Sequence, residues 1–186
     1  MRLDHVAFRV PDRHEAAKFW LAEPFNYKIQ AEFEIPELCT RCLALTPPEK
    51  ELSAATKDPL PFIGSVAWGY AFMESYDYHL APEIFISSSE DPKSPVGQWV
   101  TAKGGGGVHH MAYNVEDVGA MMERLRSLGW QFTTDKPIVD EDLTQCFTKP
   151  LTQLGGLIIE FIDRPSSRGF STKNVRDLMR STDGLK

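Results

Sequence analysis

Cysteine is scarce in this chain of 186 residues, which contains only Cys39, Cys42 and Cys146. Three cysteines are too few, and odd in number, for the disulfide scaffold of a small secreted protein. The Cys39-x-x-Cys42 spacing supplies half of a zinc site, but no second CxxC or HxxxH motif completes four ligands. The residues after Cys42 read as a strand, whereas a redox motif lies at a helix N-terminus. We therefore interpret the cysteines as ordinary thiols.

Basic runs and long hydrophobic runs are also missing. The 20 lysines and arginines are outnumbered by 26 acidic residues, and they form no stripe of the kind typical of nucleic-acid binding. No stretch approaches the roughly 18 apolar residues of a membrane span. The first residues enter a strand pattern directly and leave no room for a signal peptide. With 42% hydrophobic residues, we expect a soluble, cytoplasmic, globular protein that binds neither nucleic acid nor membranes.

The chain contains one internal repeat. Leu3–Asp12 aligns with Val108–Asp117, so that histidine, alanine, valine and aspartate coincide and an aromatic residue occupies the same place in both. A helical pattern follows each segment, over 14–22 and 118–128, with an aspartate as its N-cap. Strand patterns over 41–46, 83–87, 144–148 and 157–162 continue the two halves. The pattern predicts an α+β fold of two tandem βαβββ modules.

The repeat also predicts how the chain is divided. A first module spans 1–103 and contains an aromatic-rich insertion at about 47–82, which is long enough to form a lid or an interface. The second module spans 104–163 and follows a glycine run, 104–107, that we interpret as a flexible link. A tail over 164–186 contains a short helix at 172–179.

Two histidines occupy equivalent positions in the repeated strands. With side chains alternating between the two faces, His5 and His110 both point away from the helices, next to small alanines that leave space around them. A single inward histidine is more often a core residue, but two at equivalent positions indicate a metal site. His109 has the opposite parity, and we interpret it as structural.

A carboxylate completes this set. Glu160 interrupts the apolar strand pattern 157–162, where a buried charge costs several kcal/mol unless a cation or hydrogen bonds compensate it. Two histidines and one carboxylate without a thiolate suit Fe(II), Mn, Co or Ni and leave open coordination positions. We predict that His5, His110 and Glu160 bind one divalent metal.

The layout resembles the vicinal oxygen chelate superfamily. Segments 3–6, 107–112 and 156–160 are similar to the ligand strands of that superfamily, in which paired βαβββ modules form a cupped mixed sheet around one metal ion. The resemblance covers nearly the whole chain apart from the insertion. It implies a metal-dependent enzyme that acts on a small molecule, and a homodimer is a further hypothesis.

The second half is similar to the catalytic domain of 4-hydroxyphenylpyruvate dioxygenase. The similar segments are Lys93-Ser94, 105–110, 145–150, 159–164 and 169–174. The resemblance implies that Gln145 reaches the substrate, that Phe147 lines the pocket, and that Phe170 closes over the substrate from a C-terminal gate helix. Those dioxygenases are about twice as long, and Pro95 and His109 replace two of their pocket glutamines.

Methylmalonyl-CoA epimerase is the second family that the ligand strands resemble. It requires a fourth metal ligand on the last strand of the first module, which falls at about Ile84 or Phe85, and a catalytic glutamate, which falls on Cys42. Glu83 lies two residues from Phe85 on the same face. A shift in register would therefore make Glu83 the fourth ligand, as in glyoxalase I.

Three functions follow from these resemblances. The first is a non-haem Fe(II) dioxygenase acting on a 2-oxo acid or a similar aromatic or apolar chelating substrate. The second is a Lewis-acid epimerase, isomerase or lyase that uses Co, Ni, Mn or Zn and a protein base. The third is a metal-free binding or resistance protein, although an empty site would leave the Glu160 carboxylate uncompensated.

Overall fold

The computed structural model describes residues 2–48, 82–140, 143–164 and 171–181. Its strands are β1 (Arg2–Arg9), β2 (Lys28–Ile35), β3 (Thr40–Thr46), β4 (Glu83–Ser88), β5 (Gly107–Asn114), β6 (Ile138–Val139), β7 (Thr144–Phe147) and β8 (Ile158–Asp163). Its α-helices are α1 (Arg13–Leu21), α4 (Pro95–Ala102), α5 (Val118–Ser127) and α6 (Thr172–Ser181). Single 3-10 turns lie at Pro36–Leu38 and Thr152–Leu154. Most of the predicted insertion, over 49–81, lies outside the described residues.

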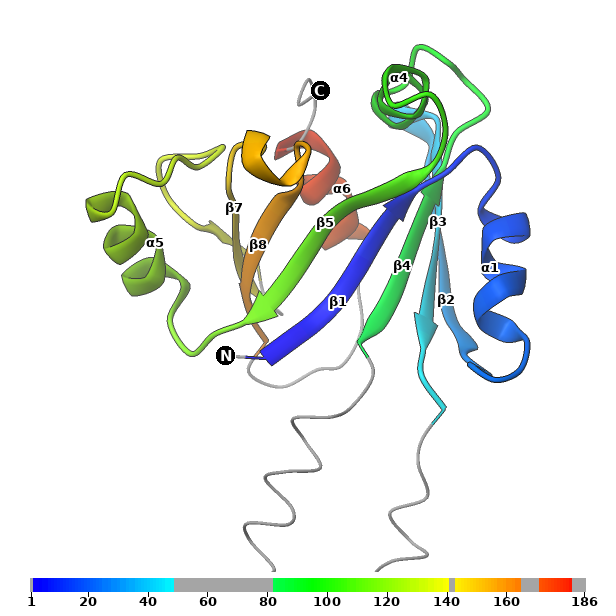
Figure 1. Ribbon diagram of the computed structural model, residues 1–186, viewed down its shortest axis with the longest axis horizontal. Coiled ribbons are helices and arrows are strands. Elements are labelled where there is room, and N and C mark those ends of the chain that lie inside the picture. Colours follow the sequence, from blue (N-terminus) through cyan, green and yellow to red (C-terminus); the bar gives the residue numbers. More distant parts are fainter. Residues whose placement is uncertain (1, 49–81, 141–142, 165–170, 182–186) are drawn as a thin grey trace, which may run out of the picture.

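The eight strands form one mixed sheet in the order β2-β3-β4-β1-β5-β8-β7-β6. The repeated strands β1 and β5 lie antiparallel at its centre, and each has a parallel neighbour on its outer side, β4 and β8 respectively. Figure 1 shows the sheet curving around an inner side, with α1 and α5 outside it. The predicted α+β fold with a β-α-β-β-β order in each half is confirmed.

The two repeated helices begin where the sequence pattern predicts. The Asp12 carboxylate accepts hydrogen bonds from the backbone N–H groups of His14 and Glu15, and Asp117 accepts one from Ala120. Gly129 follows the second helix with a φ of 89°, a left-handed conformation that glycine adopts without strain. These caps fix where the chain turns from the central strands onto the outer face of the sheet.

Helix α4 was not predicted. Its N-cap is Ser94, whose hydroxyl accepts a hydrogen bond from the backbone N–H of Gly97, and Pro95 occupies the first helical position. A Cβ at Gly97 would lie 2.2 Å from the carbonyl oxygen of Asp91, so only glycine fits. The helix leads into the glycine run, whose last member already begins β5.

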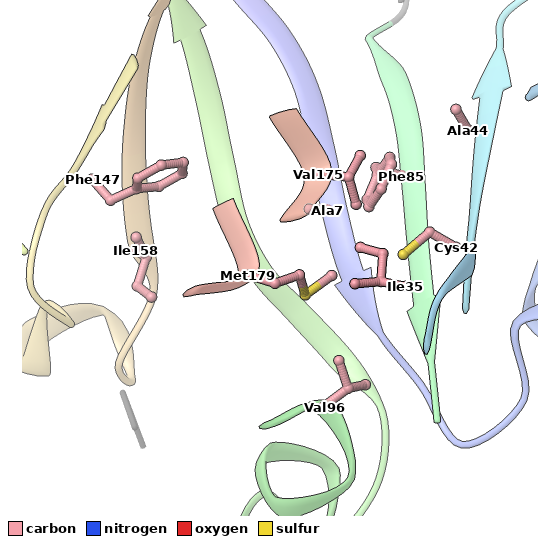
Figure 2. Close-up of a cluster of buried hydrophobic side chains, with 10 residues drawn as sticks. All are labelled: Ala7, Ile35, Cys42, Ala44, Phe85, Val96, Phe147, Ile158, Val175 and Met179. Carbon is pink, nitrogen blue, oxygen red and sulfur yellow. The ribbon is translucent and has the colours of Figure 1, made fainter. Parts of the chain in front are cut away.

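Helix α6 lies on the inner side of the sheet, between its two halves (Figure 1). Its buried side chains Val175 and Met179 pack against Ile35, Cys42 and Phe85 from the first half of the sheet (Figure 2). The predicted tail helix is confirmed, and it covers the concave face onto which His5 and His110 project. None of the helices in the described part of the chain is long and apolar enough to cross a membrane.

Candidate metal centre

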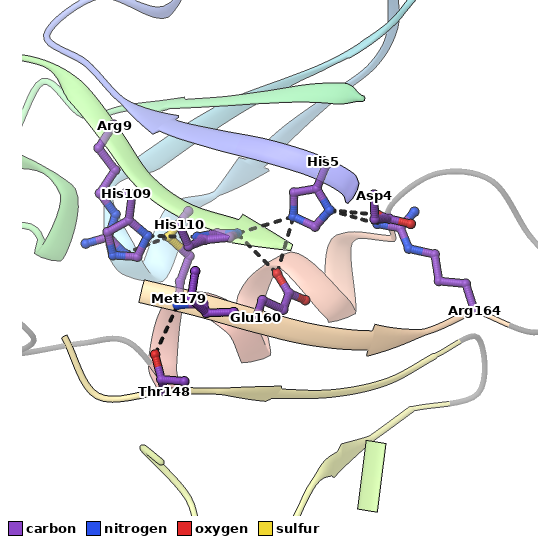
Figure 3. A network of polar contacts seen from close by, with 10 residues as sticks. Asp4, His5, Arg9, His109, His110, Thr148, Glu160, Arg164 and Met179 are labelled. Carbon is purple, nitrogen blue, oxygen red and sulfur yellow. Dashed lines mark hydrogen bonds and ion pairs between the residues drawn. The ribbon is translucent and has the colours of Figure 1, made fainter. Parts of the chain in front are cut away.

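Three buried side chains converge on the inner side of the sheet. His5 comes from β1, His110 from the adjacent β5 and Glu160 from β8, and none is more than 1% exposed. Their donor atoms form a triangle (Figure 3): the two Nε2 atoms are 3.2 Å apart, and Glu160 Oε2 lies 3.3 Å from Nε2 of His5 and 3.2 Å from that of His110. The structure therefore brings the three predicted ligands together.

The triangle fits a single divalent ion. Nitrogen and oxygen ligands lie about 2.1 Å from an ion such as zinc, so two adjacent ligands of one ion lie roughly 3.0 to 3.4 Å apart. All three edges of the triangle have this length. In the described part of the chain, the other carboxylate oxygen of Glu160, Oε1, is buried without a hydrogen bond. A cation is the natural partner for a carboxylate in such surroundings.

The charges within the triangle support the same conclusion. Burial alone would lower the pKa of His5, but the carboxylates of Glu160 and Asp4 raise it to about 9. Burial alone would raise the pKa of Glu160, but the two histidines lower it to about 2. Burial keeps the pKa of His110 below its usual value. The site thus stabilises an anionic carboxylate next to positive charge, which a proton on His5 supplies when no metal ion is bound.

The pairing of the strands shows which residue of β4, Phe85 or Glu83, lies at the position expected for a fourth ligand. In the second half, Ala112 pairs with Glu160 across β5 and β8. In the first half, the equivalent Ala7 pairs with Phe85 across β1 and β4. Phe85 therefore occupies the position that Glu160 occupies in the repeat, and it is apolar and buried. Since Phe85 cannot bind a metal ion, the equivalent position offers no fourth ligand.

Glu83 lies two residues before Phe85, and its backbone pairs with that of His5. Its carboxylate is 3.7 Å from the guanidinium of Arg164, which also lies 3.1 Å from the carboxylate of Asp4. Within the described residues, the group of metal-binding donor atoms consists of His5, His110 and Glu160 without Glu83. This arrangement makes Glu83 part of an ion-pair network beside the site.

Two of the three predicted substrate-contacting residues, Gln145 and Phe147, lie on β7 beside Glu160. Phe147 pairs with Glu160, its ring packs at right angles to that of His110, and Gln145 lies two residues away on the same face. Gln145 is buried, and its amide nitrogen has no hydrogen-bond partner within the described residues. A donor of this kind inside the cup is available to a ligand. Phe170 lies outside the described residues.

Cys42 occupies the position in the first half that Gln145 occupies in the second. Cys42 pairs with Ser87, just as Gln145 pairs with Ile162 on the equivalent strands. Burial raises the pKa of its thiol to about 12, so the thiol stays protonated at neutral pH and is a poor proton acceptor. All three cysteines are free thiols, as predicted.

The structure places His109 differently from the prediction. Its side chain is buried and its Nδ1 lies 2.9 Å from Nδ1 of His110, although the two residues are consecutive in a strand. A bulge explains this contact: Ala7 pairs with His110 and Phe8 with Val108, so His109 is an extra residue without a partner. Strict alternation of side chains does not hold at a bulge, and no sequence pattern signalled this one.

Comparison with known proteins identifies the family. The sequence profile of the Glyoxalase/Bleomycin resistance protein/Dioxygenase superfamily matches residues 4–147, which is most of the chain and includes two of the three metal-binding candidates. The chain belongs to this vicinal oxygen chelate superfamily. The eight-stranded mixed sheet and its inward-facing histidines are those expected of a member.

Several solved structures share the fold of this superfamily member. A methylmalonyl-CoA epimerase is 24% identical with a TM-score of 0.60, over 89% of this chain and 97% of that one. A Streptomyces coelicolor methylmalonyl-CoA epimerase in complex with 2-nitronate-propionyl-CoA is 21% identical with a TM-score of 0.59, over 89% and 99%. The epimerase from Mycobacterium tuberculosis is 22% identical with a TM-score of 0.59, over 89% of each chain. At these identities the likeness is one of fold.

Proposed function

We propose that this vicinal oxygen chelate protein is a metal-dependent enzyme whose ion is held by His5, His110 and Glu160. The triangle of donor atoms, its complete burial and its position at the junction of the two halves support this assignment. Two imidazoles and one carboxylate are typical of non-haem Fe(II) sites, and Co, Ni, Mn and Zn are the alternatives. When bound, the ion would supply a Lewis acid and, if it is iron, a centre for oxygen chemistry.

One candidate is a dioxygenase acting on a small chelating substrate, which the set of three ligands supports. The observation that carries this choice is Phe85, which replaces a ligand at the position equivalent to Glu160. Three protein ligands would leave other positions of a bound ion open to a small substrate that chelates it through two oxygens. A 2-oxo acid offers two such oxygens, one from its carboxylate and one from its keto group.

The surrounding residues would bind and shield this substrate. The Gln145 amide would donate a hydrogen bond to a substrate oxygen and so fix its orientation. The rings of Phe85 and Phe147 would form apolar walls that suit an aromatic or branched side chain. Val175 and Met179 of α6 pack on the inner side of the sheet and would help to keep water from the site.

The second candidate is a Lewis-acid epimerase, isomerase or lyase, and the comparisons support it better than the dioxygenase, because the solved structures described above are methylmalonyl-CoA epimerases. This chemistry needs a base near the substrate. Cys42, at the position matched to the epimerase glutamate, has a pKa of about 12. Glu83 would first have to leave Arg164, whose guanidinium lies 3.7 Å away. For proton transfer, therefore, either Cys42 would have to ionise or Glu83 would have to leave its ion pair.

Oxygen consumption tests the proposal directly. The full-length protein would be loaded anaerobically with Fe(II), mixed with a panel of 2-oxo acids, and followed by an oxygen electrode and by CO₂ release. Uptake of oxygen matched by CO₂ from one substrate, and absent in Glu160→Gln, would support the dioxygenase. Without uptake, exchange of deuterium from solvent into methylmalonyl-CoA by the Co- or Zn-loaded protein would support the second candidate. Failure to retain any metal would favour a metal-free binding protein.

A further inference from the structure

Each of the two central strands contains one bulge, and the bulges are related by the repeat. In β1, Leu3 pairs with Tyr113 and His5 with Ala112, so Asp4 is an extra residue. In β5, His109 is the extra residue. Asp4 immediately precedes the ligand His5, and His109 immediately precedes the ligand His110. The same irregularity therefore occurs beside both histidines.

Both bulges aim a side chain at the back of a ligand imidazole. The Asp4 carboxylate oxygen Oδ1 lies 2.8 Å from Nδ1 of His5, and Nδ1 of His109 lies 2.9 Å from Nδ1 of His110 (Figure 3). In each case the contact is made with the ring nitrogen that faces away from Glu160. Bulges next to functional sites commonly re-aim a side chain in this way.

These contacts determine which ring nitrogen carries the proton. An imidazole that binds a metal through Nε2 keeps its proton on Nδ1 and needs an acceptor there. Asp4 is an acceptor because it has no proton to donate when ionised. His109 is an acceptor when its own proton is on Nε2, which is buried without a hydrogen-bond partner within the described residues, while its ring packs edge-on against that of Trp99 at a centroid distance of 5.6 Å. The opposite tautomer of His109 would force the His110 proton onto Nε2 and block that ligand atom.

We propose that Asp4 and His109 are the positioning residues of the metal site, each accepting the Nδ1–H of the histidine that follows it. Both Nε2 lone pairs then point to the same place as the Glu160 carboxylate. This inference rests on the proposed metal site and extends it by two residues that do not touch the metal or the substrate. The proposal also gives His109, the first residue of the His109-His110 pair, a function.

The two acceptors differ in charge. The guanidinium of Arg164 lies 3.1 Å from the Asp4 carboxylate, an ion pair in which Asp4 is the anion. His109 is buried, and none of the ion pairs among the described residues includes it, so we expect it to act as a neutral imidazole. A neutral His109 accepts a hydrogen bond without adding a second positive charge beside the metal ion. His5 is thus hydrogen-bonded to an anionic acceptor, and His110 to a neutral one.

Matched substitutions at His109 test the proposal. In His109→Asn the amide oxygen can occupy the place of Nδ1 and accept the same hydrogen bond, whereas His109→Leu has a similar shape without a lone pair. Trp99→Phe is the control, because Trp99 packs on the His109 ring without contacting either ligand's Nδ1. Binding of Co²⁺ to the full-length protein would be followed by its visible absorption and by competition with a chelator.

We expect His109→Leu to weaken Co²⁺ binding about 10- to 100-fold, as loss of a ligand's hydrogen-bond partner typically does. His109→Asn and Trp99→Phe should stay within a few-fold of the wild type. Equal Co²⁺ affinity and the same spectrum in folded His109→Leu would overturn the proposal, as would equal losses in all three variants. If His109→Leu does not fold, His109→Ala takes its place with the same expectation.

Substitutions at Asp4 provide the second half of the experiment. Asp4→Asn keeps an acceptor oxygen but loses the charge, and Asp4→Leu loses both, so the loss of Co²⁺ affinity should increase in that order. Indistinguishable affinities of the folded Asp4 variants and the wild type would contradict the assignment of Asp4. Wild-type protein that fails to bind Co²⁺ would overturn the proposed metal site together with this inference. A wild type that binds while the variants match it would overturn this inference alone.

Discussion

Glu160 is the residue on which the metal site depends most, because its carboxylate is fully buried between two imidazoles. Glu160→Gln preserves the shape of the side chain but removes the anion. We expect metal affinity to fall by more than about 100-fold, beyond the usual effect of losing a partner behind a ligand. Metal content after anaerobic loading and desalting is the measurement.

Glu83→Gln is the matched control for this prediction. Glu83 is a carboxylate on the neighbouring strand and on the same face, but it pairs with Arg164 in place of a metal ion. The Glu83→Gln protein should keep its metal and lose at most a little stability, because only the ion pair with Arg164 is removed. If Glu83→Gln loses as much metal as Glu160→Gln, a fourth ligand has been overlooked.

The metal-free protein should lose stability as the pH rises above neutrality. The pKa of His5 is about 9 in the folded chain against 6.5 for a free histidine, so its stabilising proton is fully present below pH 6.5 and lost towards pH 9. The pKa of Glu160 is about 2 against 4.5, so its contribution is lost as the pH falls from 4.5 towards 2. The lowered pKa values of His109 and His110 also cost stability as the pH falls below 6.5, so thermal melts in the presence of a chelator should show the highest Tm near pH 6.5.

Saturating metal should remove most of the loss on the alkaline side, because the ion replaces the proton on His5. A His5→Gln variant supplies the control, since it has no imidazole to titrate. Should the chelated wild type and His5→Gln lose the same Tm between pH 6.5 and 9, His5 is not the group responsible.

Single residues also show where sequence reasoning succeeded. The repeat and the alternation of side chains predicted that His5 and His110 face inward, and an isolated charge in an apolar strand pointed to Glu160. Only the side of the sheet on which His109 lies was predicted wrongly, because a bulge changes the face of one residue without leaving a mark in the composition. Phe85 and Glu83 could not be ranked from the sequence, because the insertion before β4 leaves its register with β1 undetermined.

At the scale of the elements, the register of β4 leads to a gain-of-ligand prediction. Phe85→Glu would place a second carboxylate at the position equivalent to Glu160. With metal present, we expect affinity to rise about tenfold or more, which corresponds to about 1.4 kcal/mol. Any oxygen-dependent activity should fall, because the new ligand occupies a position that dioxygen or substrate needs. Chelator competition and oxygen uptake measure the two effects.

Phe85→Leu is the control for the register, because it remains apolar and should leave metal affinity unchanged. Without metal, Phe85→Glu should be less stable by several kcal/mol, since it buries an uncompensated charge. A folded Phe85→Glu variant with unchanged or weaker metal binding would show that Phe85 does not point to the ion.

The elements themselves were predicted to different degrees. The two repeated helices and the tail helix follow from caps and apolar spacing, which are local signals. Helix α4 also has local signals, Ser94 as cap and Pro95 as first residue, but its eight residues are nearly all apolar or small and lack a polar face. Gly97 allows the helix to approach the Asp91 carbonyl six residues earlier, a local contact that the pattern of apolar residues does not signal.

For the whole molecule, the metal site lies where the two halves meet. His5 belongs to the first half, His110 and Glu160 belong to the second, and β1 and β5 join the halves through backbone hydrogen bonds. The Arg164–Asp4 ion pair adds a polar link between the end of β8 and the start of β1. A bound ion therefore connects segments that are about a hundred residues apart in the chain.

This arrangement predicts that metal stabilises both halves together. At a free metal concentration about 100 times Kd, binding to the folded state alone adds about 2.7 kcal/mol to the free energy of unfolding. For a chain of this size the corresponding rise in Tm is roughly 5 to 10 °C.

Circular dichroism would follow the unfolding of the whole sheet. The fluorescence of Trp20 in α1 would report on the first half and that of Trp130 after α5 on the second half, each in a variant whose other tryptophans are replaced by phenylalanine. All signals should shift together in the wild type and stay in place in Glu160→Gln. A shift confined to the Trp130 signal would mean that the ion is held by the second half alone and that His5 is not one of its ligands.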